Sequence, residues 1–312
     1  MTDKRCVLLT GGGGLVGRNV LEHPLASSWN FVAPRSSELD LTDYTATECF
    51  VRKVNPDIVI HSAGLVGGIQ DNIARPVDFL VTNLDVGRNI VMASRAAGVK
   101  KLLNLGSSCM YPREAHNPLD ESLILKGELE PTNEGYALAK IAIQRLCSYV
   151  TRVNPVFQYK TMIPCNIYGR HDKFSPEHSH LIPAIIHKIH LAKINDVAEV
   201  DIWGDGTARR EFMYSGDLAD AIIKGLDDWE MLPGLMNVGL GYDYSVNEYY
   251  AAAAEVIGWS GFFRHDTTKP VGMRQKLVDV SRQSIWGWSP STSLLEGIRQ
   301  TYKYYLEYNS DL

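Results

Sequence analysis

The sequence predicts an α/β protein built on a doubly wound parallel (Rossmann) sheet, with a smaller C-terminal α/β lobe. In the first half of the 312 residues, short apolar runs alternate with stretches of helical periodicity. A glycine-rich turn joins the first apolar run to the first helical stretch. After Pro164 the alternation breaks into loops and shorter helices. Alternation with short loops is typical of a parallel sheet covered by helices on both faces.

The predicted elements follow one another along the chain. Apolar runs predict strands at Cys6–Leu9, Phe31–Ala33, Ile58–Ser62, Lys101–Leu105 and Tyr159–Ile163. Helical periodicity predicts helices between these strands at Leu15–Glu22, Ala46–Val54, Pro76–Ala97 and Tyr136–Thr151. In the second lobe, helices are predicted at Ser179–Ala192, Ser245–Ile257 and Ser293–Glu307. The stretch Phe212–Leu226 is expected to return to the first domain.

The turn after the first predicted strand carries a dinucleotide-binding pattern. Gly11, Gly14 and Gly17 have the spacing G-x-x-G-x-x-G. One glycine allows the tight turn, one lets the backbone approach a pyrophosphate, and one lets the helix pack close to the strand. The free N–H groups at the start of the helix would then bind the phosphates. The alternative is a plain glycine turn between strand and helix.

The residues after the second predicted strand favour NADP(H) over NAD(H). An NAD site usually has an acidic residue here that accepts from the ribose 2′-hydroxyl. This chain instead has Arg35 and Ser36, which suit a 2′-phosphate. Asp40, slightly further on, is expected near the adenine. The alternative for Arg35 is a solvated loop arginine.

Ser107, Tyr136 and Lys140 form a candidate catalytic set. Tyr136 and Lys140 are four residues apart and therefore share one face of the predicted helix. The ammonium is expected to lower the pKa of the phenol, which makes Tyr136 a usable proton donor or acceptor. Ser107 follows a predicted strand and can hydrogen-bond the oxygen whose charge changes as hydride moves. A Tyr-x-x-x-Lys pair alone is more often a surface pair, and the glycine loop gives it weight here.

Composition and charge narrow the class of protein. A hydrophobic content of 45% in 312 residues is enough for a large core in two lobes. The net charge of −5 argues against a nucleic acid or an anionic membrane as partner. The sequence has no run of about twenty apolar residues, so we expect neither a membrane helix nor a signal peptide. Five scattered cysteines without metal-ligand spacing predict free thiols, no metal site and a cytoplasmic location.

Several longer stretches support a more specific assignment. They are Gly106–Pro112, Leu129–Glu134, Asn166–Gly169, Ser179–Pro183, Trp203–Thr207 and Arg210–Phe212. Through them the chain resembles the extended short-chain dehydrogenases/reductases, and within that group the GDP-L-fucose synthase family, over almost its whole length. The resemblance implies an NADP(H)-dependent epimerase/reductase whose substrate is a GDP-linked 4-keto-6-deoxymannose.

The same resemblance assigns proton transfer to Cys109 and His180. A 4-keto group acidifies the hydrogens on C3 and C5, because the ketone stabilises the enolate. Inversion then needs a base on one face of the sugar and an acid on the other. A thiol beside a cation ionises near neutral pH, and imidazole titrates in the same range. Judged alone, Cys109 would more often be a small buried apolar residue and His180 a hydrogen-bonded loop histidine.

Substrate contacts are implied for the second lobe. The residues that match the family at these positions are Asn166, Lys188, Trp203, Arg210 and, more weakly, Lys276. A cationic side chain would pair with the diphosphate and the indole would pack on a ring. Lys188 as a solvated residue and Trp203 as a core residue are the alternatives. We expect an NADP-binding domain over residues 1–165, completed by 212–238, and a nucleotide-sugar-binding domain over 166–211 and 239–312.

Departures from the family pattern leave the sugar open. His187–Lys188 replaces a stretch with two arginines, and Arg209 adds an arginine before Arg210. A colitose-type synthase, which inverts only C5 of a 3,6-dideoxy sugar, is the first alternative, and a GDP-heptose epimerase/reductase is another. A 4,6-dehydratase fits less well, because it would have an acidic pair at Cys109–Met110. An NADP(H)-sensing regulator without catalysis is the alternative from a different class, and the intact Ser, Tyr and Lys set argues against it.

The family resemblance also implies an oligomer. The predicted helices Pro76–Ala97 and Tyr136–Thr151 resemble those that pair into a four-helix bundle across dimers of this superfamily. We therefore expect a homodimer.

Overall fold

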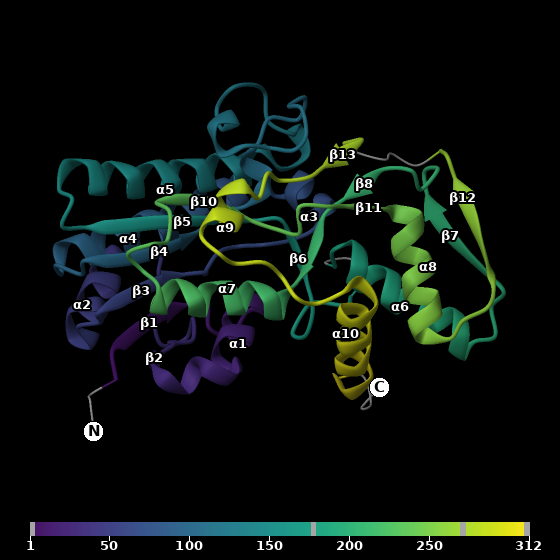
Figure 1. The fold of residues 1–312 in the computed structure, drawn as a ribbon, viewed down its shortest axis with the longest axis horizontal. Helices are drawn as coiled ribbons and strands as arrows, with labels where there is room; N and C mark the ends of the chain where they lie inside the picture. Colours follow the sequence, from purple (N-terminus) through teal and green to yellow (C-terminus); the bar gives the residue numbers. More distant parts are fainter. Residues whose placement is uncertain (1–3, 176–178, 269–272, 309–312) are drawn as a thin grey trace.

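A computed structural model describes residues 4–175, 179–268 and 273–308. Its first part is a six-stranded parallel sheet with the strand order β10-β5-β4-β3-β1-β2 (Figure 1). The strands are β1 Cys6–Thr10, β2 Asn30–Val32, β3 Ile58–His61, β4 Lys101–Leu105, β5 Gln158–Pro164 and β10 Leu235–Val238.

Two layers of helices cover this sheet because side chains alternate between its faces. Val7 and Leu9 pack into one apolar cluster with α1 and α7, whereas Leu8 packs into another with α2, α4 and α5. The helices of the first layer are α1 Leu15–Leu21 and α7 Ser215–Asp227. Those of the second are α2 Tyr44–Val54, α4 Pro76–Ala96 and α5 Glu134–Val153.

The second part of the chain, at the right of Figure 1, forms three small sheets and three longer helices. The paired strands are β6 Asn166–Tyr168 with β9 Phe212–Tyr214, β7 Glu199–Trp203 with β12 Phe262–Asp266, and β8 Arg209–Arg210 with β11 Tyr244–Ser245 and β13 Gln275–Lys276. The helices are α6 Leu181–Ile194, α8 Val246–Ile257 and α10 Leu294–Tyr308. Two short helices complete the fold: α3 Ile69–Ala74 contacts α4, and α9 Ser281–Ile285 contacts β10. An apolar cluster joins α6, α8 and α10.

The topology fixes where a ligand site can form. β1 lies between β2 and β3, so the chain leaves β1 to one side and then returns to the other. In open parallel sheets, ligands bind at such a reversal, beyond the carboxyl ends of the strands. The glycine-rich turn, the loop after β3 and the loop after β4 all begin at this edge.

The α/β prediction with a doubly wound parallel sheet is confirmed. All five predicted strands form, and their ends differ from the prediction by one residue at most. After β9, α7 packs against α1 and β10 pairs with β5. No helix within the described ranges is both long enough and apolar enough to span a membrane.

A buried asparagine links β10 to two distant segments. The Asn237 Nδ2 donates to the carbonyl oxygens of Leu119, at 2.9 Å, and Asp279, at 3.0 Å. Its Oδ1 accepts from the Tyr111 hydroxyl at 2.5 Å. The Leu119 N–H donates in turn to Leu277 O at 2.8 Å. Asn237 therefore helps to fix the segment that contains β13 against the main sheet.

Asn237→Ala should lower the free energy of unfolding by roughly 2–4 kcal/mol, because it removes the partner of the buried Tyr111 hydroxyl and of the Asp279 carbonyl and leaves the Leu119 carbonyl with one donor, the Asp279 N–H. Urea unfolding followed by circular dichroism measures this change. The control is Asn30→Ala, an exposed site on the edge strand β2, where the change should be below about 0.5 kcal/mol. Equal effects at the two positions would contradict the role given to Asn237.

Candidate active site

The glycine-rich turn has the geometry of a phosphate-binding loop. Gly11 has φ +75°, and a Cβ there would lie 2.7 Å from the Ala63 nitrogen, so only glycine fits. A Cβ on Gly17 would lie 2.3 Å from Gly11 O, which shows how closely α1 approaches the turn. Gly14 caps α1 without a side chain, and both it and Gly13 are exposed. The backbone between strand and helix is thus open to a pyrophosphate, as NADP(H) requires.

The predicted adenosine-side residues follow β2. Arg35 and Ser36 are exposed, and the Arg35 N–H donates to Glu38 Oε2 at 2.7 Å, which closes a turn. Asp40 is also exposed, and its Oδ1 accepts from the Thr42 N–H at 2.9 Å and from the Thr42 hydroxyl at 2.7 Å. These bonds lower the pKa of Asp40. Arg35 follows β2, so it lies at the same edge of the sheet as the glycine turn after β1.

Ser107, Tyr136 and Lys140 lie together at the carboxyl end of β4. Ser107 hydrogen-bonds the Tyr136 hydroxyl, and its Oγ accepts from the Cys109 N–H at 3.2 Å. The Lys140 Nζ is 5.7 Å from the centre of the Tyr136 ring and donates to Leu105 O at 3.1 Å. Lys140 is only 7% exposed, and burial lowers its pKa to about 8.

The expected lowering of the Tyr136 pKa is wrong. Loss of contact with water raises the pKa of the phenol, the nearby Cys109 raises it further, and the hydrogen bond to Ser107 only partly opposes these effects. Burial also disfavours the charged form of Lys140 and so lowers the pKa of its ammonium. The hydroxyl of Tyr136 is therefore protonated at neutral pH, which suits a proton donor.

The sulfur of Cys109 accepts from two nitrogen donors. The Asn133 Nδ2 lies 3.2 Å from Sγ, and the Lys276 Nζ lies 3.5 Å from it. Asn133 belongs to the start of α5 and Lys276 to β13, which are far apart in the sequence. A cation and an amide donor both stabilise negative charge on a sulfur. Lys276 was predicted, with less support than the others, to contact the substrate, and it lies beside the thiol.

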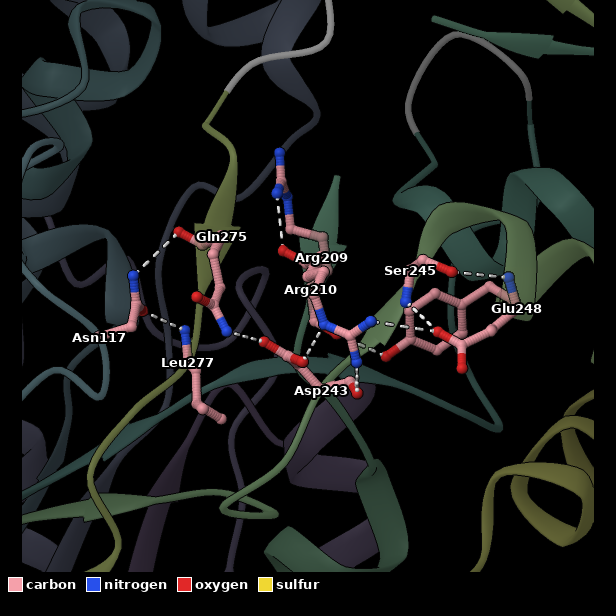
Figure 2. Close-up of polar contacts among 9 residues, drawn as sticks. Asn117, Arg209, Arg210, Asp243, Ser245, Glu248, Gln275 and Leu277 are labelled. Carbon is pink, nitrogen blue, oxygen red and sulfur yellow. Dashed lines mark hydrogen bonds and ion pairs between the residues drawn. The ribbon is translucent and has the colours of Figure 1, made fainter. Parts of the chain in front are cut away.

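Polar side chains on both sides of β13 bond Gln275 and Leu277, the two neighbours of Lys276 (Figure 2). The Asn117 amide contacts both neighbours of Lys276: its Nδ2 donates to Gln275 O at 3.5 Å, and its Oδ1 accepts from the Leu277 N–H at 2.7 Å. On the other side, the Gln275 Nε2 donates to Asp243 Oδ2 at 2.6 Å. The backbone on either side of Lys276 is therefore held in place.

The additional arginine of this chain belongs to the same network. The Arg209 Nε lies 2.6 Å from Asp243 Oδ1, and its guanidinium also donates to Asp243 O at 2.7 Å. Figure 2 shows the Arg210 side chain extending away from Asp243, with its guanidinium donating to Arg209 O at 2.8 Å. Arg209 is therefore part of the β8–β11–β13 sheet, and Arg210 is the arginine that projects from it.

His180 is the residue that precedes α6. It is partly exposed, and burial together with the charge of Lys173 lowers its pKa. A Cβ on Gly68, which precedes α3, would lie 3.5 Å from the carbonyl oxygen of Ser179. Because α3 also packs against Pro131–Asn133, the His180 segment approaches the cluster from the α3 side. The cluster is the group of Ser107, Cys109, Tyr136 and Lys140.

The other predicted substrate residues are spread over the second part of the chain. The Asn166 Nδ2 donates to Glu211 O at 2.9 Å, next to Arg210. The charge of Glu130, just before the Asn133 turn, acts on Arg210, which places Arg210 near the cluster. Lys188 lies in a groove between α6 and β7 and donates to Asp201 O, and Trp203 ends β7 with 54% of its surface exposed.

Three residues near the cluster were not predicted from the sequence. They are Asn133, His61 and Asn83. The ring of His61 bonds the Thr10 hydroxyl at 2.9 Å, and burial and the Lys140 charge lower its pKa to about 3. The Asn83 amide is paired with the backbone of Leu65 and so holds the loop after β3. Asn133 lies in the stretch Leu129–Glu134, which resembles the family, but no role was assigned to it. Its position just before a predicted helix was the only local feature that could have drawn attention to it.

Comparisons with known proteins show the family of this chain. Residues 7–239 match the model of the NAD dependent epimerase/dehydratase family. A GDP-L-colitose synthase from Yersinia pseudotuberculosis is 50% identical over 306 residues, which cover 98% of this chain and 99% of that protein. A GDP-L-fucose synthase from Azorhizobium caulinodans is 51% identical and covers 97% of both chains.

A solved structure gives the same picture. The GDP-mannoheptose C4 reductase from Campylobacter jejuni with NADP bound is 30% identical, covers 98% of this chain and 99% of that one, and superposes with a TM-score of 0.86. This chain therefore belongs to the NAD dependent epimerase/dehydratase family, and within it to the group that contains the GDP-L-fucose and GDP-L-colitose synthases.

Proposed function

We propose that this protein is a bifunctional, NADP(H)-dependent epimerase/reductase that converts a GDP-linked 4-keto-6-deoxy-D-mannose to GDP-L-fucose. The observation that carries the proposal is the position of the Cys109 sulfur. The sulfur lies beside the Lys276 ammonium, and the backbone N–H of Cys109 donates to Ser107, which bonds the Tyr136 hydroxyl. A base for carbon acids and an acid for a carbonyl oxygen are thus neighbours in one cluster.

NADP(H) fits the carboxyl edge of the sheet. The turn Gly11–Gly17 would hold the pyrophosphate, and Arg35 with Ser36 would bind the 2′-phosphate. Lys140 would bind the nicotinamide ribose. When bound, NADPH supplies the hydride for C4. The NADP-bound heptose reductase of the same fold supports this choice of cofactor.

Epimerisation comes first in the proposed sequence. Cys109, as a thiolate, removes the proton from a carbon next to the ketone, and the Ser107 and Tyr136 hydroxyls stabilise the negative oxygen of the enolate. His180 then returns a proton from the opposite face, which inverts the centre. The lowered pKa of His180 makes its protonated form a stronger acid and favours the neutral imidazole at neutral pH.

Reduction uses the same oxygen site. As C4 accepts hydride, Tyr136 donates its hydroxyl proton to the C4 oxygen, while Ser107 keeps a hydrogen bond to that oxygen. A phenol that stays protonated at neutral pH is suited to this step. One pair of oxygen donors therefore serves both the enolate and the alkoxide.

Substrate binding is assigned to the second part of the chain. Arg210 and Lys188 would bind the diphosphate, with Asn166 and Trp203 on the sugar and the base. On this basis residues 1–165 with 212–238 form the NADP-binding domain, and residues 166–211 with 239–312 form the nucleotide-sugar-binding domain. The five free thiols of the described chain support a cytoplasmic enzyme.

Conversion of GDP-4-keto-3,6-dideoxy-D-mannose to GDP-L-colitose is the second candidate. It is favoured by the 50% identity to a colitose synthase, almost the same as the 51% to a fucose synthase.

The test that separates the two candidates is turnover of both sugars with NADPH in D2O, followed by NMR. Deuterium at C3 and C5 of the product supports the fucose assignment, and turnover of only the dideoxy sugar, with deuterium at C5, supports colitose. Tight NADPH binding without turnover of either sugar would instead indicate a regulator.

We also propose a homodimer formed through α4 and α5. An apolar groove runs between these helices, and Val77, Val81, Leu138 and Tyr149 on them are more than 40% exposed. The groove is lined by Leu84, Arg88, Met92, Ala142, Ile143, Leu146 and Tyr149. Pairing these helices across two copies would bury this surface.

Tyr136→Phe should lower the rate of NADPH oxidation by about 10²–10⁴-fold, because the proton donor is lost while the ring stays in place. Exchange of substrate hydrogens with D2O should become slower but continue, since one of the two enolate donors is lost while Ser107, Cys109 and Lys276 remain. Absorbance at the NADPH band and NMR measure the two steps separately. Tyr149→Phe, at an exposed site on the same helix, is the control. Undiminished reduction in the Tyr136 variant would show that another group is the acid.

Leu146→Glu should give a monomer of about half the wild-type mass, because it places a charge in the apolar groove. Size-exclusion chromatography with light scattering measures the mass against the 34.8 kDa of one chain. Val153→Glu adds the same charge at an exposed site near the end of α5 and should leave the dimer intact. A wild-type mass of one chain would contradict the dimer.

A further inference from the structure

Asn133 occupies a helix N-cap position but does not cap the helix. It is the residue before α5, where asparagine usually accepts a hydrogen bond from an N–H of the first turn. Here its side chain makes no capping bond. Its Nδ2 instead donates to Cys109 Sγ at 3.2 Å. The chain therefore gives up a stabilising cap at this position, and the amide contacts a sulfur.

The local structure holds the Asn133 amide in this orientation. The turn Pro131–Asn133 is closed by a bond from the Asn133 N–H to Glu130 O at 3.1 Å. The Glu130 carboxylate accepts from the Thr132 hydroxyl at 3.2 Å, and α3 packs against the turn. The Asn133 Oδ1 is buried without a hydrogen-bond partner. Burying an unpaired carbonyl is unfavourable, so the arrangement is not explained by stability.

The Cys109 sulfur is the acceptor in both of its side-chain contacts. Asn133 and Lys276 both direct N–H groups at Sγ. A neutral thiol has a proton to donate and is a weak acceptor, whereas a thiolate accepts from several donors. The titratable groups that face the sulfur are Lys276 from β13 and Tyr136 from α5. Asn133 is the uncharged donor of this set.

The contacts also connect the two proposed half-reactions. Asn133 contacts Cys109, the Cys109 N–H donates to Ser107, and Ser107 bonds Tyr136. Tyr136 is three residues after Asn133 at the start of the same helix. The first turn of α5 thus sets the distance between the sulfur and the phenol.

We propose that Asn133 is a positioning residue for Cys109: its amide stabilises the thiolate and directs the sulfur toward the carbon acid. The proposal rests on the proposed function for its purpose, but the effect on the sulfur is independent of any substrate. Asn133 acts through Cys109 and transfers no proton itself.

The test is the rate at which iodoacetamide alkylates Cys109, measured between pH 5 and 9 by mass spectrometry of the Cys109 peptide. Cys49 is exposed and serves as an internal reference in the same sample. Asn133→Ala removes the donor, and Asn133→Asp replaces it by a carboxylate of the same shape. At pH 7 the ratio of the Cys109 rate to the Cys49 rate should fall about three- to tenfold in Asn133→Ala. It should fall further in Asn133→Asp, with the midpoint of the pH profile moved upward.

Stability separates this role from a structural one. Aspartate is as good an N-cap as asparagine, so Asn133→Asp should fold with a melting temperature at or above that of the wild type. The matched control is Asn154→Asp, an exposed residue at the other end of α5, which should leave the ratio unchanged. If Asn133→Ala fails to fold, Asn133→Ser, another good capping residue, takes its place.

A folded Asn133→Asp variant with a wild-type alkylation ratio would overturn the proposal. The result does not depend on turnover. A protein that acts on no GDP-keto sugar, but whose Cys109 loses reactivity in the Asn133 variants, would contradict the proposed function and support the role of Asn133. Wild-type turnover of a GDP-keto sugar, combined with unchanged Cys109 alkylation in the Asn133 variants, would support the proposed function and contradict the role of Asn133.

Discussion

The contact of two N–H donors with one sulfur atom, that of Cys109, is the interaction on which the rest of the proposed site depends. Carbon acids next to a ketone need a base that ionises near neutral pH, and a thiol provides one only if its surroundings favour the thiolate. In this protein the surroundings are an ammonium from β13 and an amide from the start of α5. Neither donor is close to Cys109 in the sequence, so the two donors meet at the sulfur only in the folded chain.

The fold supplies these donors by joining its two parts at the edge of the sheet. The loop after β4 carries Ser107 and Cys109, and α5 carries Tyr136 and Lys140, which the parallel sheet places together. β13 is brought to the same edge from the second part of the chain. Asn117 holds the backbone on either side of Lys276, and Asn237 ties the following segment to β10. The small β8–β11–β13 sheet therefore has a direct connection to the chemistry.

Much of the fold and part of the site could be predicted from the sequence. Apolar runs and glycine spacing are local signals, so the strands and the turn at Gly11 were placed closely. Lys276 was predicted only as a weak substrate contact, because a contact across 167 residues leaves no local pattern. The Tyr136 pKa was predicted in the wrong direction, since helical spacing shows that a cation is near but not how much water is lost. Arg209 departs from the family pattern, and the structure explains it through an ion pair with Asp243. The sequence gives no local signal for this pair.

The central claim is that Cys109 and His180 act on opposite faces of the sugar ring, and isotope exchange in two variants tests it most directly. Cys109→Ser and His180→Gln would each be incubated with the GDP-4-keto sugar in D2O without NADPH, and C5 followed by NMR. We expect no exchange in the cysteine variant, and exchange without inversion in the histidine variant, because the thiol returns deuterium to the face from which it removed the proton. Inversion at the wild-type rate in either variant would show that Cys109 and His180 do not act on opposite faces.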